Sequence, residues 1–271
     1  MQTPKAPDTS LIVHQRKGQL VDSAQAALAS SLTAQFYEHE AASFSATRQQ
    51  GWQGWELLLP YIAPLAKTRA AQGVPLRLID LGCGNLRFET WLKGKLPQEA
   101  AFEALGVDRC LPLVAEGMGL EGVRTASFDL ASLGPLPVEW QGNFDVAVCF
   151  GLIHHLPLAS QRHALIERLS SLLAPGGVAA VACWRFMDDG RLSTKAQQVT
   201  LEARKRWPEL VDSFGPKDWL LGWQGSTEVV RFCHHVDEEE LDSLMGPVQE
   251  RARFFADGSS GTLNRYVVFE P

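Results

Sequence analysis

The sequence lacks several features that would place it in a class of protein at once. No two of its five cysteines have the C-x-x-C spacing of a zinc site or a redox centre. No apolar run is long enough to span a membrane, and residues 1–10 lack the apolar core of a signal peptide. These absences predict a cytoplasmic protein with no membrane segment and no bound metal.

An excess of positive charge is also lacking. The chain has 25 Lys and Arg against 31 Asp and Glu, which gives a net charge of −6. This balance argues against nucleic-acid binding by bulk electrostatics alone, but it allows a local basic patch or a partner that supplies one. The residues that could form such a patch beside a binding site are Arg185, Arg191, Lys195, Arg204, Lys205 and Arg206.

What is present is enough apolar sequence for a large α/β core. The 271 residues are 45% hydrophobic and contain no internal repeat. We expect a helical extension over residues 1–70, beginning with a loose leader at 1–20, and a single domain over 71–271. Residues 185–236 are expected to be an insertion on the substrate side. Phe214–Gly225 has the composition of a loop.

Short apolar runs alternate with helical patterns through this domain. Five such strands predict a doubly wound parallel sheet, and two later strands predict an antiparallel hairpin that completes seven. The strands are expected at Leu76–Leu81, Phe102–Val107, Val123–Phe128, Phe144–Phe150, Val178–Trp184, Val248–Phe255 and Leu263–Phe269. The helices are expected at Arg87–Lys95, Leu111–Gly117, Ala159–Leu173, Arg191–Leu210 and Asp237–Leu244.

A glycine-rich turn follows the first strand, in the segment L-I-D-L-G-C-G-N (Leu78–Asn85). Gly82 and Gly84 allow the backbone to approach a ligand closely. The third glycine of a dinucleotide-binding G-x-G-x-x-G turn is absent, and Asp80 precedes the first glycine by two residues. A carboxylate at this place can accept a hydrogen bond from the α-ammonium of a ligand with an amino-acid tail. The pattern resembles motif I of the class I S-adenosylmethionine-dependent methyltransferases.

That resemblance implies roles for residues at the ends of the next three strands. Asp108 would accept hydrogen bonds from both ribose hydroxyls of S-adenosylmethionine, and Asp129 would contact its adenine amino group. Leu130 would pack on the adenine ring, and Phe150 would lie near the reactive end of the cofactor. Ligands of such sheets bind at the carboxyl ends of the strands, where all these residues fall.

Two further segments resemble the tRNA wobble-uridine methyltransferases, which esterify 5-carboxymethyluridine. Phe36–Trp52 contains a Tyr, an F-S-x-T-R run and a Trp at the family's spacing, and Arg231–His234 matches a later R-x-x-H region. The resemblance implies a carboxylate acceptor in tRNA and a small activating protein partner. It also implies that Tyr37 closes over the cofactor. Arg48 would contact both cofactor and acceptor.

A carboxylate is ionised at neutral pH and needs cations to orient it rather than a general base. Arg48, Arg231 and His234 are the candidates for this role, because arginine recognises carboxylates in a bidentate manner.

A small-molecule O- or N-methyltransferase is the alternative function. A hydroxyl or amine acceptor would make a base useful, and His154 and His155 after the fourth strand are the first choices. Each of these histidines is equally consistent with a structural role. A third alternative is a cofactor-binding subunit without activity, against which the intact Asp80, Gly82, Gly84 and Asp108 argue.

Overall fold

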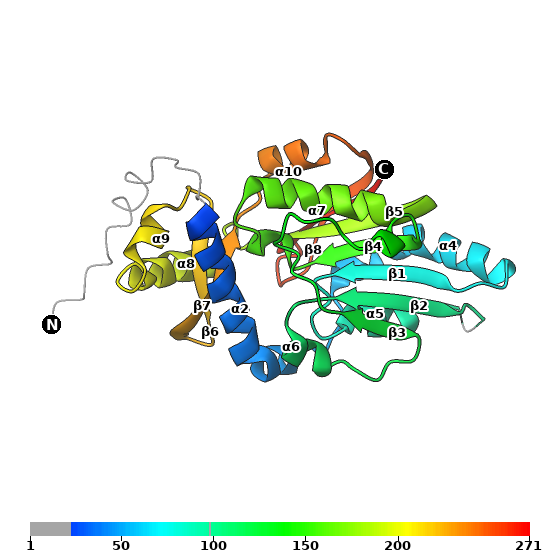
Figure 1. Ribbon diagram of the computed structural model, residues 1–271, viewed down its shortest axis with the longest axis horizontal. Helices are drawn as coiled ribbons and strands as arrows, with labels where there is room; N and C mark the ends of the chain where they lie inside the picture. The colour runs from blue at the N-terminus through cyan, green and yellow to red at the C-terminus, as the bar shows by residue number, and fades with distance from the viewer. Residues whose placement is uncertain (1–22, 98) are drawn as a thin grey trace.

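The main body of the protein is a seven-stranded sheet with helices on both faces (Figure 1). The computed structural model describes residues 23–97 and 99–271; the predicted leader at residues 1–20 lies outside them. The strand order is β3-β2-β1-β4-β5-β9-β8. The strands are β1 (Leu76–Leu81), β2 (Phe102–Val107), β3 (Val123–Ala126), β4 (Phe144–Phe150), β5 (Leu173–Trp184), β8 (Gln249–Ala256) and β9 (Asn264–Glu270).

The strand directions confirm the predicted fold class. β1 to β5 pair in parallel, whereas β9 runs antiparallel to both β5 and β8. The central strands read as apolar runs because helices cover both of their faces. One face packs against α7 (Ala159–Leu172) and α10 (Glu238–Met245). The other packs against α3 (Gln53–Glu56), α4 (Leu59–Ala71) and α5 (Arg87–Lys93).

The remaining elements lie in the connections and at one end of the molecule. They are α2 (Ser23–Ala46), α6 (Leu111–Ala115), η1 (Val138–Trp140), η2 (Ile153–His155), α8 (Gly190–Ala203) and α9 (Pro208–Asp212). The single helix predicted over Arg191–Leu210 is divided in two. The break falls before Pro208, whose ring and missing N–H stop a helix from continuing through it. No helix in the described part of the chain is both long and apolar enough to cross a membrane.

A second, two-stranded sheet was not expected from the sequence. β6 (Asp218–Trp223) and β7 (Ser226–His234) pair antiparallel, so the prediction of a loop over Phe214–Gly225 is wrong. The strands are joined by Gln224 and Gly225, whose φ values of 48° and 88° suit a two-residue hairpin turn. A glutamine at such a position is uncommon, and this concealed the turn.

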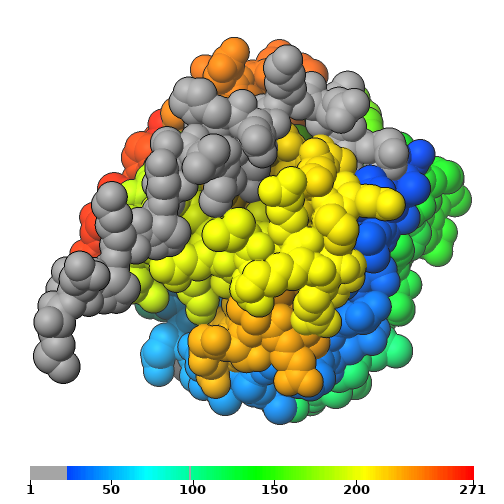
Figure 2. Space-filling model, turned by 90° about the vertical axis from the view of Figure 1, so that its left-hand side faces the viewer, coloured from blue at the N-terminus to red at the C-terminus, as the bar shows by residue number. Residues whose placement is uncertain are grey.

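This hairpin stands between two helices that lie along its edges. On one side the Thr33 hydroxyl of α2 accepts a hydrogen bond from the Phe232 N–H of β7 at 3.0 Å. On the other side the Thr200 hydroxyl of α8 accepts from the Leu220 N–H of β6 at 2.9 Å. In Figure 2, which shows this end of the molecule, the hairpin lies between α2 (blue) and α8 (yellow-green). The helix α2 is thereby held against the segment that contains α8 and the hairpin.

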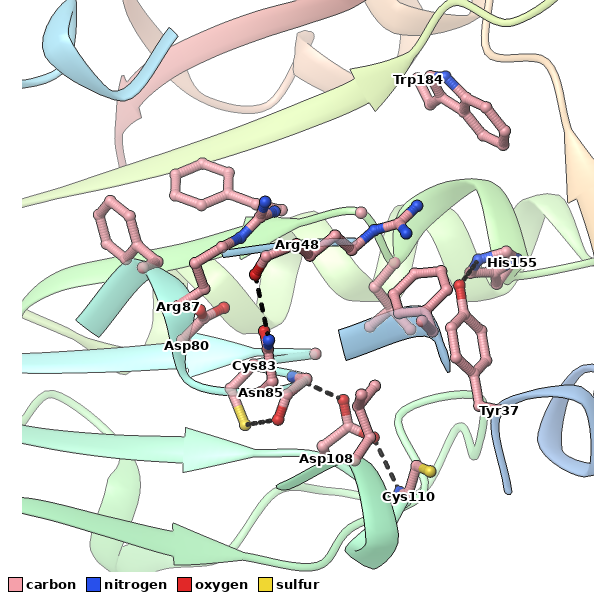
Figure 3. A pocket seen from close by; sticks show the side chains of 18 of the residues that line it. Tyr37, Arg48, Asp80, Cys83, Asn85, Arg87, Asp108, Cys110, His155 and Trp184 are labelled. Atoms are coloured by element: carbon pink, nitrogen blue, oxygen red, sulfur yellow. Dashed lines mark hydrogen bonds between the residues drawn. The ribbon is translucent and has the colours of Figure 1, made fainter. Parts of the chain in front are cut away.

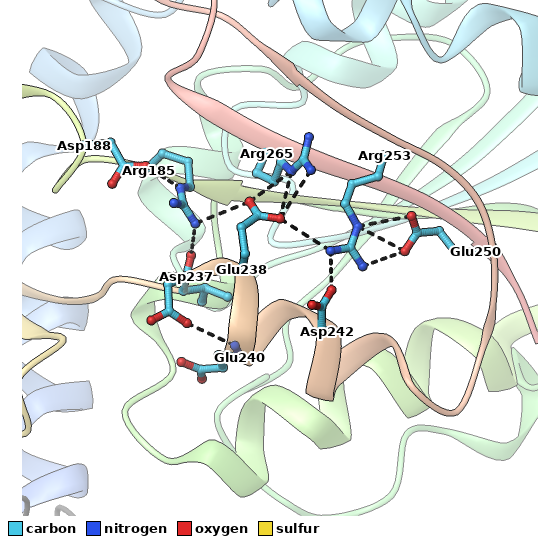
Figure 4. A network of polar contacts seen from close by, with 10 residues as sticks. Arg185, Asp188, Asp237, Glu238, Glu240, Asp242, Glu250, Arg253 and Arg265 are labelled. Carbon is cyan, nitrogen blue, oxygen red and sulfur yellow. Dashed lines mark hydrogen bonds and ion pairs between the residues drawn. The ribbon is translucent and has the colours of Figure 1, made fainter.

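Charged side chains hold α10 against the antiparallel end of the sheet (Figure 4). Glu238 of α10 lies 3.7 Å from Arg185 after β5, 3.4 Å from Arg253 of β8 and 3.1 Å from Arg265 of β9. Arg253 also pairs with Asp242 at 2.5 Å. Arg185 therefore serves the fold here and not a binding surface.

Candidate functional site

A cavity of about 640 Å³ opens at the carboxyl ends of the parallel strands (Figure 3). Of the predicted site residues, only His234 is missing from its lining. The predicted residues that line it are Tyr37, Arg48, Asp80, Gly82, Gly84, Asp108, Asp129, Leu130, Phe150, His154 and Arg231. The structure thus gathers residues from the first 50 positions, the strand ends and the hairpin around a single space.

The glycine turn offers a buried carboxylate to a cation. Asp80, at the carboxyl end of β1, is 3% exposed, and its Oδ1 has no hydrogen-bond partner among the described residues. Gly82 has a φ of 87°, and a Cβ there would lie 2.9 Å from the Cβ of Leu152. An unpaired carboxylate oxygen beside a turn that contains two glycines fits the α-ammonium of S-adenosylmethionine.

Asp108 fixes the shape of this turn from the end of β2. One carboxylate oxygen accepts from the Gly84 N–H at 3.0 Å, and the other accepts from the Cys110 N–H at 2.8 Å. Each oxygen keeps a second lone pair, which can accept a ribose hydroxyl. Burial raises the pKa of Asp108, although these backbone hydrogen bonds oppose the shift.

The next strand end has the features expected for an adenine site. Leu130 is 4% exposed and lines the cavity with the partly buried Phe128. Asp129 is exposed and accepts from the Ala131 N–H at 3.1 Å. Leu130 and Phe128 can pack against a planar base, and Asp129, whose Oδ1 also pairs with Arg109 at 3.4 Å, can accept from the amino group of the base with its other oxygen.

Two histidines follow β4, and they differ in their hydrogen bonds. His155 Nδ1 lies 2.6 Å from the Phe232 carbonyl, which can only accept, so this nitrogen carries the proton. His155 Nε2 then accepts from the Tyr37 hydroxyl at 2.8 Å. Burial lowers the pKa of His155 to about 3 and raises that of Tyr37 to about 12, so both are neutral. Tyr37 is thus held by this hydrogen bond at the side of the cavity.

His154 is placed differently. It is 5% exposed, and its Nδ1 has no hydrogen-bond partner among the residues described. Burial lowers the pKa of His154 well below its usual value, and the charges of nearby groups, Arg231 included, act in the same direction. A neutral ring with a free nitrogen can take part in proton transfer or orient an acceptor.

Arg231 of β7 forms a cationic end of the cavity. The residue is 5% exposed, and Nε and Nη1 have no hydrogen-bond partner in the described part of the chain. Its guanidinium carbon lies 4.4 Å from the ring centre of Phe36, 5.8 Å from that of Trp184 and 5.7 Å from that of Trp223. The Cys233 thiol that it contacts is neutral, because burial raises its pKa to about 12.

Arg48 adds a second guanidinium at this end. Its guanidinium carbon lies 3.4 Å from the ring centre of Phe44 and 5.1 Å from that of Trp223. Burial lowers the pKa of Arg48 to about 10, with a further contribution from the positive charge of Arg231. Two guanidinium groups that repel each other in an aromatic surround favour an anion between them.

His234 is not brought to the cavity. Its Nδ1 lies 2.5 Å from Asp218 and its Nε2 lies 2.8 Å from Glu240. Burial alone would lower the pKa of His234, but these two carboxylates raise it overall. The resulting imidazolium joins β7 to β6 and α10, so its position supports a structural role.

A potential metal-binding cluster also lies here, although the sequence predicts no metal. The ligand atoms of His154, His155 and Cys233 lie within 4.8 Å of one another. Both ring nitrogens of His155 are already hydrogen-bonded, and the Cys233 thiol is protonated. A metal ion would have to break the hydrogen bonds that place Tyr37, and we assign none.

Several lining residues were missed by the sequence reasoning. Asn85 donates to the Ser45 hydroxyl at 3.0 Å and to the Arg48 carbonyl at 3.3 Å, which ties the glycine turn to the end of α2. Arg87 lies 4.9 Å from the ring of Trp52 and donates to the Gln50 carbonyl at 3.0 Å. These contacts join segments about 40 residues apart, which no local pattern reveals.

The strand order, the glycine turn and the acidic strand ends together define a class I methyltransferase. The chain belongs to the methyltransferase domain family, whose model matches residues 46–247. A solved S-adenosylmethionine-dependent methyltransferase from Methanosarcina mazei shares the fold, with a TM-score of 0.53 at 14% identity. That match covers 72% of this chain and 92% of the other. The relationship agrees with the cofactor predicted from the sequence.

Two curated relatives match parts of the chain. The tRNA (carboxymethyluridine(34)-5-O)-methyltransferase ALKBH8 of Macaca fascicularis is 28% identical over 55% of this chain and 19% of its own length. Trans-aconitate 2-methyltransferase of Methylobacterium nodulans is 35% identical over 42% of this chain and 40% of its own length. The chain thus spans less than half of either relative.

Proposed function

We propose that this methyltransferase uses S-adenosylmethionine to methylate a carboxylate. When bound, the cofactor supplies a methyl group on a positively charged sulfur, which leaves as a neutral thioether. Asp80, Asp108, Asp129 and Leu130 would hold it, and Phe150 and Tyr37 would line its reactive end. A carboxylate acceptor would need no proton removed, so the residues that meet it would only have to bind and orient it.

The buried, unpaired guanidinium of Arg231 is the observation that carries this proposal. Leaving two charged N–H groups without a partner in an apolar surround is costly, and the described residues provide no carboxylate for them. A substrate carboxylate would supply both the charge and the two acceptor oxygens. Arg48 would act from the other side, and the aromatic rings would exclude water from the pair.

The first acceptor class is the carboxymethyl group of a modified uridine in tRNA. The ALKBH8 relative is named for this reaction, and the Phe36–Trp52 segment resembles that family. The buried cation and the absence of any need for a base suit such an acceptor. A cytoplasmic location and an activating partner protein stay predictions.

The second class is a small-molecule carboxylate. The trans-aconitate methyltransferase relative supports it, since aconitate carries carboxylates. Geometry supports it too: none of the six basic residues considered for a rim is among those that line the cavity. In the described chain the cationic groups of the cavity itself are Arg48, Arg87, Arg109 and Arg231.

Transfer of a labelled methyl group tests the proposal. The protein is incubated with labelled cofactor and either deproteinised tRNA or a panel of small carboxylates, trans-aconitate included. We expect a base-labile ester with one of the two. A label found only in base-stable products would contradict a carboxylate acceptor.

Substitution of Arg231 tests its role in the transfer. Arg231→Met should lower kcat/KM for the acceptor by roughly 100-fold, because one partner of a buried ion pair is removed. The Kd for S-adenosylmethionine, measured by calorimetry, should change less than about threefold, since the cofactor contacts are untouched. Arg204→Met, at a surface pair with Asp212, is the matched control. If Arg231→Met lowered the affinity for S-adenosylmethionine as much as it lowered kcat/KM, Arg231 would belong to the cofactor site instead.

A further inference from the structure

A second hollow lies between α8 and the tip of the β6–β7 hairpin. Its lining combines two cations and one carboxylate with mostly polar residues: Arg191, Thr194, Lys195, Gln198, Val199, Glu202, Gly225 and Thr227. Neither Arg191 nor Lys195 pairs with a carboxylate within the described chain, whereas most other basic residues of this segment do. The elements around the hollow face the viewer in Figure 2.

Strand β7 connects this hollow to the large cavity. Side chains alternate along a strand, so Thr227, Val229 and Arg231 share one face. Thr227 lines the second hollow and Arg231 lines the large cavity. Four residues of strand span roughly 13 Å, which sets the separation of the two sites.

The electrostatic pattern shows that the cations act on one another. Burial lowers the pKa of Lys195, and the charges of Arg231 and Arg191 lower it further. Arg191 and Lys195 lie one helical turn apart on α8 and line the second hollow, while Arg231 lines the large cavity. These three cations are called the track below.

The carboxylates near this track are engaged elsewhere or face away. Glu202 pairs with Lys205 at 2.5 Å, and Asp188 pairs with Arg185 at 2.7 Å. Asp189 accepts from the Leu192 N–H at the start of α8, and Asp218 holds His234. Glu228 and Arg231 are three residues apart on β7, so their side chains point to opposite faces of the strand. In the described residues no carboxylate pairs with Arg191 or Lys195, and Glu202, the one acidic residue of the hollow's lining, is paired with Lys205.

We propose that the methyl acceptor carries a second anionic group, which Lys195 and Arg191 bind in the second hollow. The inference rests on the proposed carboxylate acceptor at Arg231. The second group is a phosphate or a further carboxylate, placed roughly 10–13 Å from the carboxylate that is methylated. A nucleotide phosphate and the far carboxylate of a long-chain dicarboxylic acid both have this chemistry, whereas the carboxylates of aconitate lie too close together to occupy both sites.

Paired acceptors test this inference. The first pair is 5-carboxymethyluridine and its 3′-phosphate; the second is decanedioate, whose extended chain separates its two carboxylates by this distance, and its singly charged monomethyl ester. With wild-type enzyme, we expect the form with the second anion to have at least tenfold higher kcat/KM in whichever pair is methylated. The responding pair shows whether the anion is phosphate or carboxylate.

Variants of Lys195 test whether the track causes the preference for the acceptor with the second anion. Lys195→Ala should remove most of that advantage, roughly five- to tenfold as for a half-buried ion pair, and Lys195→Arg should restore it. The form with a single charge should be turned over equally by wild type and variant. Lys67→Ala, at an exposed lysine of α4, is the charge-matched control and should change nothing.

The outcomes separate this inference from the proposed function. If a carboxylate is methylated but Lys195→Ala slows both members of a pair equally, the second site is wrong and the carboxylate acceptor stands. If no carboxylate is methylated, inorganic phosphate serves as an independent probe by calorimetry. Equal phosphate affinity of wild type and the double variant Arg191→Ala, Lys195→Ala would overturn the anion site itself.

Discussion

At the scale of single residues, the least expected group is Glu89 in the first turn of α5. It is fully buried, and neither carboxyl oxygen has a hydrogen-bond partner in the part of the chain described. Burial raises its pKa from 4.5 to about 8. The folded protein therefore binds this proton more tightly than the unfolded chain does, and the free energy of unfolding should fall as the pH rises from 4.5 to about 8.

The variant Glu89→Gln should remove the part of this pH dependence that Glu89 contributes; the contribution of Asp80, whose pKa burial and the Glu89 charge raise, stays. At pH 5 the variant and the wild type should be equally stable, since both side chains are neutral. Above pH 8 the variant should be more stable by about 1–3 kcal/mol, because only the wild type buries a charge. Urea unfolding at both pH values measures the difference. Glu239→Gln, at an exposed glutamate of α10, should show none. A constant gap between Glu89→Gln and wild type would refute the shifted titration.

Leu86 shows why part of the site could not be predicted. The sequence shows that the third glycine is missing, and Leu86 follows the turn in the left-handed region with a φ of 56°. This conformation costs a leucine about 1–2 kcal/mol. The side chain is 1% exposed and packs where a Cβ on Gly106 would approach it to 2.6 Å. The packing of this side chain against Gly106 on the next strand offsets the cost of its backbone conformation. No local sequence pattern reveals that contact.

At the scale of elements, a buried side-chain hydrogen bond joins α2 to β7. The Thr33 hydroxyl accepts from the buried Phe232 N–H at 3.0 Å and donates to the Ala29 carbonyl at 2.9 Å. Thr33→Val has nearly the same shape but leaves the N–H unpaired, which should cost about 1–3 kcal/mol in the free energy of unfolding. Thr33→Ser keeps the hydroxyl and should cost less. Chemical denaturation of the two variants decides between them, and equal stabilities would show that water or a shift of α2 satisfies the N–H.

Elements with regular patterns were predicted well, and those shaped by tertiary contacts were not. The strands from Leu76 to Trp184 were found because buried parallel strands are continuous apolar runs. The hairpin was missed because β6 is bounded by a Gln224-Gly225 turn without the usual asparagine or aspartate. As a result, the surroundings of Arg231 could not be predicted, since its guanidinium faces Trp184 and Trp223 only once β7 has paired with β6 and packed against α2.

At the scale of the whole molecule, the basic side chains are mostly neutralised by the fold. Arg204 pairs with Asp212 at 2.6 Å, Lys205 pairs with Glu202, and Arg206 donates to the Glu228 carbonyl at 2.9 Å. With Arg185 held by α10, four of the six basic residues that could have formed a rim are engaged. The net charge of −6 gives no general attraction to a polyanion.

The affinity for a tRNA acceptor should depend only weakly on salt concentration, because few basic side chains are free to meet phosphates. If Arg191 and Lys195 are the two surface cations that meet phosphates, the affinity for a tRNA acceptor should fall only roughly tenfold between 50 and 200 mM salt. A surface with six to ten phosphate contacts would lose about 10³–10⁵ over the same range. Acceptor KM at fixed, saturating cofactor measures the slope, with cofactor Kd as the control for general salt effects. A steep slope would mean that basic groups outside the described cavity and track also contact the RNA. Residues 1–22 or a partner protein would then supply them, and the acidic body of this enzyme would not recognise RNA alone.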